Sequence, residues 1–118
     1  VSKKLICTNP DLIVHKGSVE ELCAGSVAKV FEDLGGEVIY FGKPHKEVYD
    51  MCISPDEKVL AIGDNLRTDI KGANNLKIDC IFISDGVHRK EFNNFSELNN
   101  LLEKYNVTAN FFQKELKW

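Results

Sequence analysis

The sequence predicts an α/β fold built on a parallel β-sheet, and three observations support this prediction. Short apolar runs typical of strands alternate with segments whose apolar residues recur at helical spacing. The run 38–41 is almost continuously apolar, which favours a strand covered on both faces of its sheet. The run Val59–Ile62 leads directly into Gly63-Asp64, and an acid at the carboxyl end of a parallel strand lies where open α/β sheets bind ligands.

The strands are predicted from short runs of β-branched, aromatic and other apolar residues that are bounded by turn residues. The predicted strands are 4–7, 38–41, 58–62 and 79–84, with a further short extended piece at 12–14. The turn Asn9-Pro10-Asp11 ends the first strand, because proline cannot donate to a ladder and Asn and Asp favour turns. Asp85-Gly86 ends the last one.

The helices follow the strands in alternation. The predicted helices are 18–34, 46–52, 68–75 and 96–105. Ser18 is the expected N-cap of the first, with Glu21 as its capping-box acid, although Gly25 allows a later start near Ser26. Ser96 is the expected N-cap of the last helix, and the aromatic tail 110–118 is expected to pack back onto the fold.

Composition narrows the possible functions. The chain has 118 residues, 43% of them hydrophobic and 28% charged, as expected for one soluble globular domain or part of one. A net charge of −3 gives no electrostatic basis for binding nucleic acid, and no apolar run reaches the roughly 20 residues of a membrane helix. The four cysteines are widely spaced without a C-x-x-C pair, which favours reduced thiols and a cytoplasmic location.

Two carboxylates five residues apart are the strongest functional signal. Asp64 directly follows a strand and a glycine, where folding alone requires no acid. Asp69 is either a site residue or an acid that stabilises the first turn of the next helix. Paired carboxylates at a strand end suit an oxygen-coordinated divalent cation, so the pattern indicates a Mg²⁺ site.

A lysine is expected at the same edge of the sheet. Gly42-Lys43-Pro44 follows the strand 38–41, so Lys43 and Asp64 are predicted to lie close together. An ammonium group at that position would pair with a phosphate and with a carboxylate. The alternative for a lone lysine is a solvated surface side chain.

These segments resemble a known family. Residues 42–45 and 63–74 resemble the third and fourth motifs of the haloacid dehalogenase (HAD) superfamily, class IIA, which includes NagD-like and p-nitrophenyl phosphatase-like hydrolases. Thr8-Asn9-Pro10-Asp11 and Ala24-Gly25-Ser26 resemble stretches near the end of the cap domain of those proteins. The resemblance extends from about Leu5 to Phe92.

The resemblance implies a Mg²⁺-dependent phosphohydrolase that acts on a small phosphorylated metabolite through an aspartyl-phosphate. Lys43 would screen charge between the nucleophile and the phosphate, so it is a candidate catalytic residue. Asp64 would be the direct Mg²⁺ ligand. Asp69 would be a second acid, counted both as a catalytic residue and as a metal ligand, that positions metal-bound water or Lys43.

The chain departs from the family pattern in one respect. The family's nucleophile lies in an Asp-x-Asp motif, and this sequence contains none. The chain is therefore expected to be the C-terminal part of such a protein, a partial HAD-type Rossmann-like sheet with helices on both faces, inactive alone. Residues 1–37 are interpreted as the remnant of the cap domain and residues 38–118 as the C-terminal part of the core.

A partial sheet has a physical consequence. If the preceding strands are missing, a parallel edge is exposed around Val59–Ile62, and such edges are normally covered. The chain is then expected to need its N-terminal half or self-association. Two other interpretations stay open: a non-catalytic remnant or assembly module of the same fold, and an unrelated flavodoxin-like or receiver-like domain in which Asp64 is a loop acid. The last one fails if Lys43 and Asp64 lie on the same sheet edge within reach of one ion site.

Overall fold

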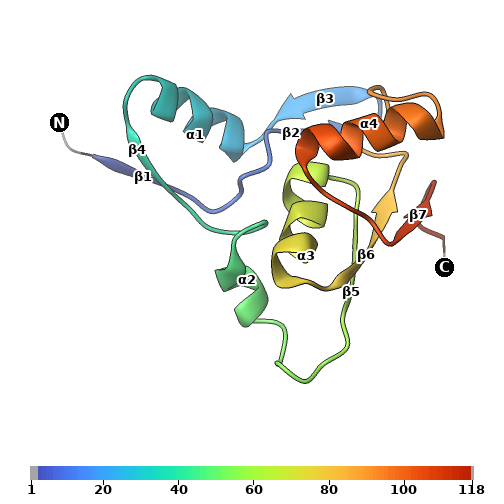
Figure 1. Ribbon diagram of the computed structural model, residues 1–118. Helices are drawn as coiled ribbons and strands as arrows, with labels where there is room; N and C mark the ends of the chain where they lie inside the picture. The colour runs from blue at the N-terminus through green and yellow to red at the C-terminus, as the bar shows by residue number, and fades with distance from the viewer. Residues whose placement is uncertain (1–2, 118) are drawn as a thin grey trace.

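A computed structural model describes residues 3–117 (Figure 1). The strands are β1 (Lys4–Cys7), β2 (Ile13–Lys16), β3 (Val19–Leu22), β4 (Glu37–Tyr40), β5 (Leu60–Gly63), β6 (Asp79–Ile83) and β7 (Phe111–Gln113). The helices are α1 (Ala24–Asp33), α2 (Lys46–Asp50), the π-helical turn η1 (Leu66–Ile70), α3 (Lys71–Leu76) and α4 (Phe95–Tyr105). From β3 onward strands and helices alternate as predicted, and the α/β fold class is confirmed.

The larger sheet holds β5, β6 and β7 in that order, and both of its pairings are parallel. Cys80 and Phe82 point from β6 into the core, where both are fully buried. Around them pack buried apolar residues of η1, α3, α4 and the segment that follows α4: Leu66, Ile70, Ala73, Leu98, Leu101, Leu102 and Val107. This cluster fixes the position of the segment that carries Asp64 and Asp69.

The other face of this sheet carries apolar side chains that nothing in residues 3–117 covers fully. Leu60 and Ile62 alternate with the inward-facing Ala61 along β5, and they are 47% and 45% exposed. β5 also lies at the edge of the sheet, with β6 as its only partner among the described strands. The chain therefore presents an apolar parallel edge at the segment where the sequence predicted one.

A second parallel pair is formed by β1 and β4, with Leu5 opposite Val38 and Cys7 opposite Tyr40. Helix α1 packs against both strands, on the left of Figure 1. The strand 38–41 therefore belongs to the sheet of β1 and not to the sheet of β5. The expected boundary between residues 37 and 38 falls inside β4, so the division into cap and core stays a prediction.

The first predicted helix begins too early. Residues 19–22 form β3, which pairs antiparallel with β2 across a turn at Gly17-Ser18. Gly17 has φ +64°, a conformation that favours a hairpin turn over a helix start. The helix begins at Ala24, close to the later start near Ser26 that the sequence also allowed. Its N-cap is Cys23 and not Ser18. The hairpin runs from the side of α1 toward α4 (Figure 1).

Two smaller differences concern helix ends. Asn94, not Ser96, caps α4, because its side-chain oxygen accepts a hydrogen bond from the Glu97 backbone N–H at 2.9 Å. The helix predicted to begin at Thr68 begins earlier, with the turn η1. The tail does pack back as expected, since Phe111–Gln113 forms β7 beside β6; Trp118 lies outside the described residues.

Candidate functional site

The turn after β4 and the segment after β5 meet at one place. Lys43 Nζ forms an ion pair with Asp69 Oδ1, although the two residues lie on different elements. The Lys43 side chain is 47% exposed, whereas that of Asp69 is only 12% exposed. The structure thus brings together the lysine and one of the acids that the sequence singled out.

Both carboxylate oxygens of Asp69 have partners. Oδ1 accepts from Lys43, and Oδ2 accepts from the Asn65 backbone N–H at 3.1 Å. The side chain also packs against the end of β5, where a Cβ on Gly63 would lie 2.3 Å from Asp69 Cβ. This geometry favours a positioning role for Asp69 toward Lys43 over a role as a free metal ligand.

Asp64 has a freer carboxylate. Its Oδ2 accepts a hydrogen bond from the Val87 backbone N–H at 2.9 Å, while Oδ1 has no hydrogen bond within residues 3–117. Gly86 makes this approach possible, because a Cβ at that position would lie 2.2 Å from Asp64 Cβ. The loop after β6 therefore orients Asp64 and leaves one oxygen available.

The charge on Lys43 is reinforced by its surroundings. Partial burial lowers the pKa of Lys43, but the hydrogen bond and the charge of Asp69, together with the charge of Asp11, outweigh burial. The net effect raises its pKa above the ordinary value of 10.5. Lys43 therefore stays an ammonium ion at neutral pH and is suited to face a phosphate.

These residues line a common cavity of about 410 Å³. Its lining includes Lys43, Asp64 and Asp69 together with residues of the loops after β1 and β6 and of the β2–β3 hairpin, among them Asp11, His15 and Arg89. Lys43 and Asp64 thus share one cavity, although the strands before them belong to different sheets and do not form the single sheet edge that the sequence predicted.

The π-helical turn η1 explains how Asp64 and Asp69 come to face the same cavity. The Asn65 backbone carbonyl accepts from both Asp69 N and Ile70 N, at 2.9 and 3.1 Å. The Asn65 side chain accepts from the Arg67 backbone N–H at 3.0 Å and so caps the turn. Leu66 and Ile70 are fully buried, which anchors the turn in the core. Asn65 therefore stabilises this turn through both its backbone and its side chain, a role that the sequence analysis did not predict.

His88 also contacts the turn η1. The ring is 6% exposed, and Nε2 accepts from the Leu66 backbone N–H at 3.1 Å while Nδ1 contacts Glu91. Nε2 is therefore the acceptor nitrogen of this ring, and Nδ1 faces the Glu91 carboxylate. No local sequence pattern predicts this role, because His88 lies 22 residues from Leu66.

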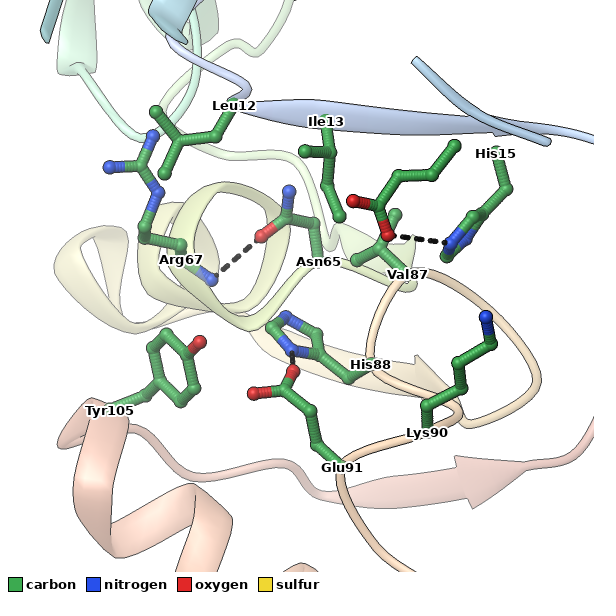
Figure 2. Close-up of a pocket in the computed structure, with 11 residues that line it drawn as sticks. Leu12, Ile13, His15, Asn65, Arg67, Val87, His88, Lys90, Glu91 and Tyr105 are labelled. Carbon is green, nitrogen blue, oxygen red and sulfur yellow. Dashed lines mark hydrogen bonds and ion pairs between the residues drawn. The ribbon is translucent and has the colours of Figure 1, made fainter. Parts of the chain in front are cut away.

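A second cavity, of about 290 Å³, adjoins the first across Asn65 and His15 (Figure 2). Figure 2 shows Tyr105 from α4 and His88 on its lower side and the hairpin residues Leu12, Ile13 and His15 on its upper side. Within residues 3–117, neither ring nitrogen of His15 has a hydrogen-bond partner, although Nε2 lies 3.5 Å from Glu20 Oε2, within ion-pair range if the ring is protonated.

The carboxylates of the site provide some, but not all, of the oxygen ligands that a divalent cation needs. Asp64 offers one free carboxylate oxygen, and Mg²⁺ commonly takes one or two protein carboxylates, with water and substrate phosphate as the other ligands. Within residues 3–117 no group of three or more His, Cys, Asp or Glu side chains is arranged to hold a metal ion. The described residues thus fit a cation that is held partly by groups from elsewhere.

Comparison with known proteins decides the family. Residues 40–106, more than half of the chain, match the HAD-hydrolase-like family. The chain belongs to this family. Membership excludes the flavodoxin-like or receiver-like alternative, and it places both Lys43 and Asp64–Asp69 inside the matched region. The prediction of the HAD superfamily is confirmed.

One curated relative and three solved structures show how far the similarity extends. The relative is a cardiolipin synthase (CMP-forming) / mitochondrial hydrolase fusion protein from Schizosaccharomyces pombe, 31% identical over 74 residues, which cover 49% of this chain and 12% of that protein. A haloacid dehalogenase-like hydrolase from Brucella suis 1330 is 27% identical with a TM-score of 0.78, over 98% of this chain and 45% of that one.

Two phosphatases extend the comparison. The 4-nitrophenylphosphatase from Thermotoga maritima is 26% identical with a TM-score of 0.66, over 93% of this chain and 41% of that one. A glycerol phosphate phosphatase from Mycobacterium tuberculosis, solved in complex with calcium, is 25% identical with a TM-score of 0.57, over 70% and 25%. The expected likeness to p-nitrophenyl phosphatase-like hydrolases is confirmed, and the chain spans less than half the length of these solved relatives.

No helix within residues 3–117 has both the length and the apolar character to cross a bilayer.

Proposed function

We propose that this chain supplies the lysine and cation-binding half of a Mg²⁺-dependent phosphohydrolase site. The observation that carries the proposal is the shared cavity. It is lined by Asp64 and by Lys43, which forms an ion pair with Asp69. The family match and the phosphatases among the similar structures support the same reaction class. A small phosphorylated metabolite is the proposed substrate, its phosphate directed at Lys43.

Each residue has a proposed role in phosphate chemistry. Lys43 binds the phosphate and offsets its charge, as a fixed cation does in transition states with developing negative charge. Asp69 orients Lys43 through their ion pair. Asp64 would hold the cation with its free oxygen; a bound Mg²⁺ would act as a Lewis acid on the phosphoryl oxygens. The calcium in the similar phosphatase structure supports a hard divalent cation here.

The remaining part of the site is proposed to come from a second segment of polypeptide. The exposed edge of β5, with Leu60 and Ile62, supports this, because an apolar parallel edge is normally covered. The N-terminal half of a protein of this family would both cover this edge and supply the Asp-x-Asp motif, whereas a second copy of this chain would cover the edge alone, because it lacks that motif. We further propose residues 1–37 as cap and 38–118 as core, and a cytoplasmic location, which the four free cysteines favour.

A phosphatase assay tests the proposal. The substrate is p-nitrophenyl phosphate with Mg²⁺, and the chain is assayed alone and together with the part of the Brucella suis hydrolase that it does not match, called here the complementary segment. The same segment with the hydrolase's own remaining part is the positive control. We expect activity only in the mixture. Activity of the chain alone would contradict the half-site, and an inactive mixture beside an active control would favour the non-catalytic assembly module.

A further inference from the structure

Asp11, in the loop between β1 and β2, contacts the site from outside the matched motifs. Its Oδ1 accepts two hydrogen bonds, from Thr68 Oγ1 at 2.8 Å and from Asn65 Nδ2 at 3.0 Å. Thr68 is 1% exposed and Asn65 is 9% exposed, so both donors are buried in the turn that carries Asp64 and Asp69. One carboxylate oxygen thus joins the first loop of the chain to the cation-binding segment.

These two bonds answer a specific requirement of the turn. A buried hydroxyl or amide without a partner loses its hydrogen bonds to water without compensation, which destabilises the conformation that buries it. Within residues 3–117, Asp11 is the acceptor for both the Thr68 hydroxyl and the Asn65 amide. Without it, the turn would relax to bring these groups to solvent.

The contacts continue from Asn65 to the site itself. The Asn65 backbone N–H donates to Asp69 Oδ2, and Asp69 Oδ1 pairs with Lys43. A displacement of Asn65 would therefore move both the acid that orients the lysine and the neighbouring Asp64. Asp11 lies at the origin of this series of contacts.

Asp11 is itself held in place by its own loop. Its backbone N–H donates to Asn9 Oδ1 at 3.2 Å, and its carbonyl accepts from the Gly25 N–H at the start of α1 at 3.1 Å. The Arg67 guanidinium, from η1, donates to the neighbouring Pro10 carbonyl. The loop and the turn thus contact each other at two points, and the Asp11 backbone is held by its own loop and by α1 while its side chain reaches the site.

We propose that Asp11 is a positioning residue that holds Asn65 and Thr68 so that Asp64 and the Asp69–Lys43 pair face the cavity. This inference rests on the proposed function of those three residues. A role as metal ligand is the competing explanation, and its predictions differ, because the positioning role uses the hydrogen-bond acceptor and the ligand role uses the negative charge. Asp11→Asn keeps an acceptor oxygen and removes the charge, whereas Asp11→Ala removes both.

The test is a Mg²⁺ titration of the whole chain followed by NMR. Loss of an outer contact of this kind typically weakens metal binding about 10- to 100-fold. We expect Asp11→Ala to weaken Mg²⁺ binding by about 10-fold or more, and Asp11→Asn to restore it. Thr68→Val, which removes only the hydroxyl, should weaken binding in the same direction. Asp56→Ala, an exposed acid in the loop before β5, is the matched control and should change nothing.

A second readout reports the position of the turn without any metal. Amide hydrogen exchange at Asn65, whose N–H donates to Asp69, should become faster in Asp11→Ala but not in Asp11→Asn, while exchange at Phe82 in the core stays unchanged. If Asp11→Ala fails to fold, Thr68→Val with Thr68→Ser as its rescue replaces it in both measurements.

The outcomes distinguish the positioning role of Asp11 from a ligand role, and both from a failure of the proposed cation site. Unchanged exchange at Asn65 and unchanged Mg²⁺ binding in Asp11→Ala would overturn the positioning role. Equal loss of binding in Asp11→Asn and Asp11→Ala would overturn it in favour of a ligand role. If the unaltered chain shows no Mg²⁺ binding even with the complementary segment present, the proposed cation site of this chain fails, and exchange at Asn65 still decides the role of Asp11.

Discussion

Lys43 and Asp69 form an ion pair between the turn that follows β4 and the π-helical turn that follows β5. The two strands belong to different sheets, so this pair joins the two parallel units of the chain at the proposed site. Because Lys43 is half exposed, the pair is expected to add less than about 1 kcal/mol to stability. Its importance lies in where it holds the ammonium group.

The raised pKa of Lys43 gives a prediction about pH. A pKa that is higher in the folded chain than the ordinary 10.5 means that the stabilising effect of the pair is complete below that value and is lost as the pH rises through the folded pKa. NMR titration of the Lys43 side chain should therefore give a midpoint above 10.5, and Asp69→Asn should lower it. A midpoint that Asp69→Asn leaves unchanged would show that the ion pair does not form in solution.

Gly86 gives a prediction about the orientation of Asp64. A Cβ at Gly86 would lie 2.2 Å from Asp64 Cβ, so Gly86→Ala should displace the carboxylate and break its bond to the Val87 N–H. A displacement of about 1 Å at a reacting centre costs on the order of 100-fold in rate, which is the loss expected in the complemented phosphatase assay.

Gly35→Ala is the matched control for this substitution. Gly35 has φ +84° and lies beyond the end of α1, and an added Cβ would meet no atom within 4 Å. It should cost about 1 kcal/mol of stability through backbone strain and leave the rate unchanged. An equal loss of rate in both variants would mean that the effect of Gly86→Ala is one of stability alone.

The sequence was sufficient to predict the parts of the site that depend on local pattern. Asp64 follows an apolar run and a glycine, and Lys43 follows another strand, so both were expected at strand ends. The shared cavity confirms their proximity, although their roles stay predictions. The first helix was predicted too early because Ser18 and Glu21 fit a capping box, whereas tertiary pairing with β2 makes the same residues part of a hairpin.

The remaining features depend on contacts between distant segments. No sequence feature of residues 38–41 predicts that this strand pairs with β1 and not with β5. Asp11 lies 54 and 57 residues from the two side chains that it accepts from, and a turn acid is what its own segment predicts. For Asp11, the one signal in the sequence was the resemblance of residues 8–11 to a cap motif, and that resemblance assigned no role to Asp11.

The apolar face of β5 gives a prediction about assembly. Ile62→Lys places a charge on a face that is 45% exposed in this chain, so the chain alone should lose less than about 0.5 kcal/mol of stability. In the assembly the same charge would be buried without a partner, and the complementary segment should bind much more weakly. Sedimentation of the mixture over a range of concentrations measures this binding.

Met51→Lys is the control for the assembly experiment. Met51 is 88% exposed at the end of α2 and does not belong to the β5–β6–β7 sheet. It should leave binding of the complementary segment unchanged. If Ile62→Lys binds as well as the unaltered chain, the β5 face is not the surface that the partner covers. A sharp, concentration-independent thermal transition of the monomeric chain alone would contradict its need for a partner.

The most direct test of the half-site is the rate of p-nitrophenyl phosphate hydrolysis by the chain with its complementary segment, compared with the same mixture carrying Asp64→Asn. Removal of one such electrostatic group costs about 3 kcal/mol of transition-state stabilisation, so the account predicts Mg²⁺-dependent activity that falls at least about 100-fold in the variant. An equal rate for Asp64→Asn, or activity that persists when Mg²⁺ is removed by EDTA, would contradict it.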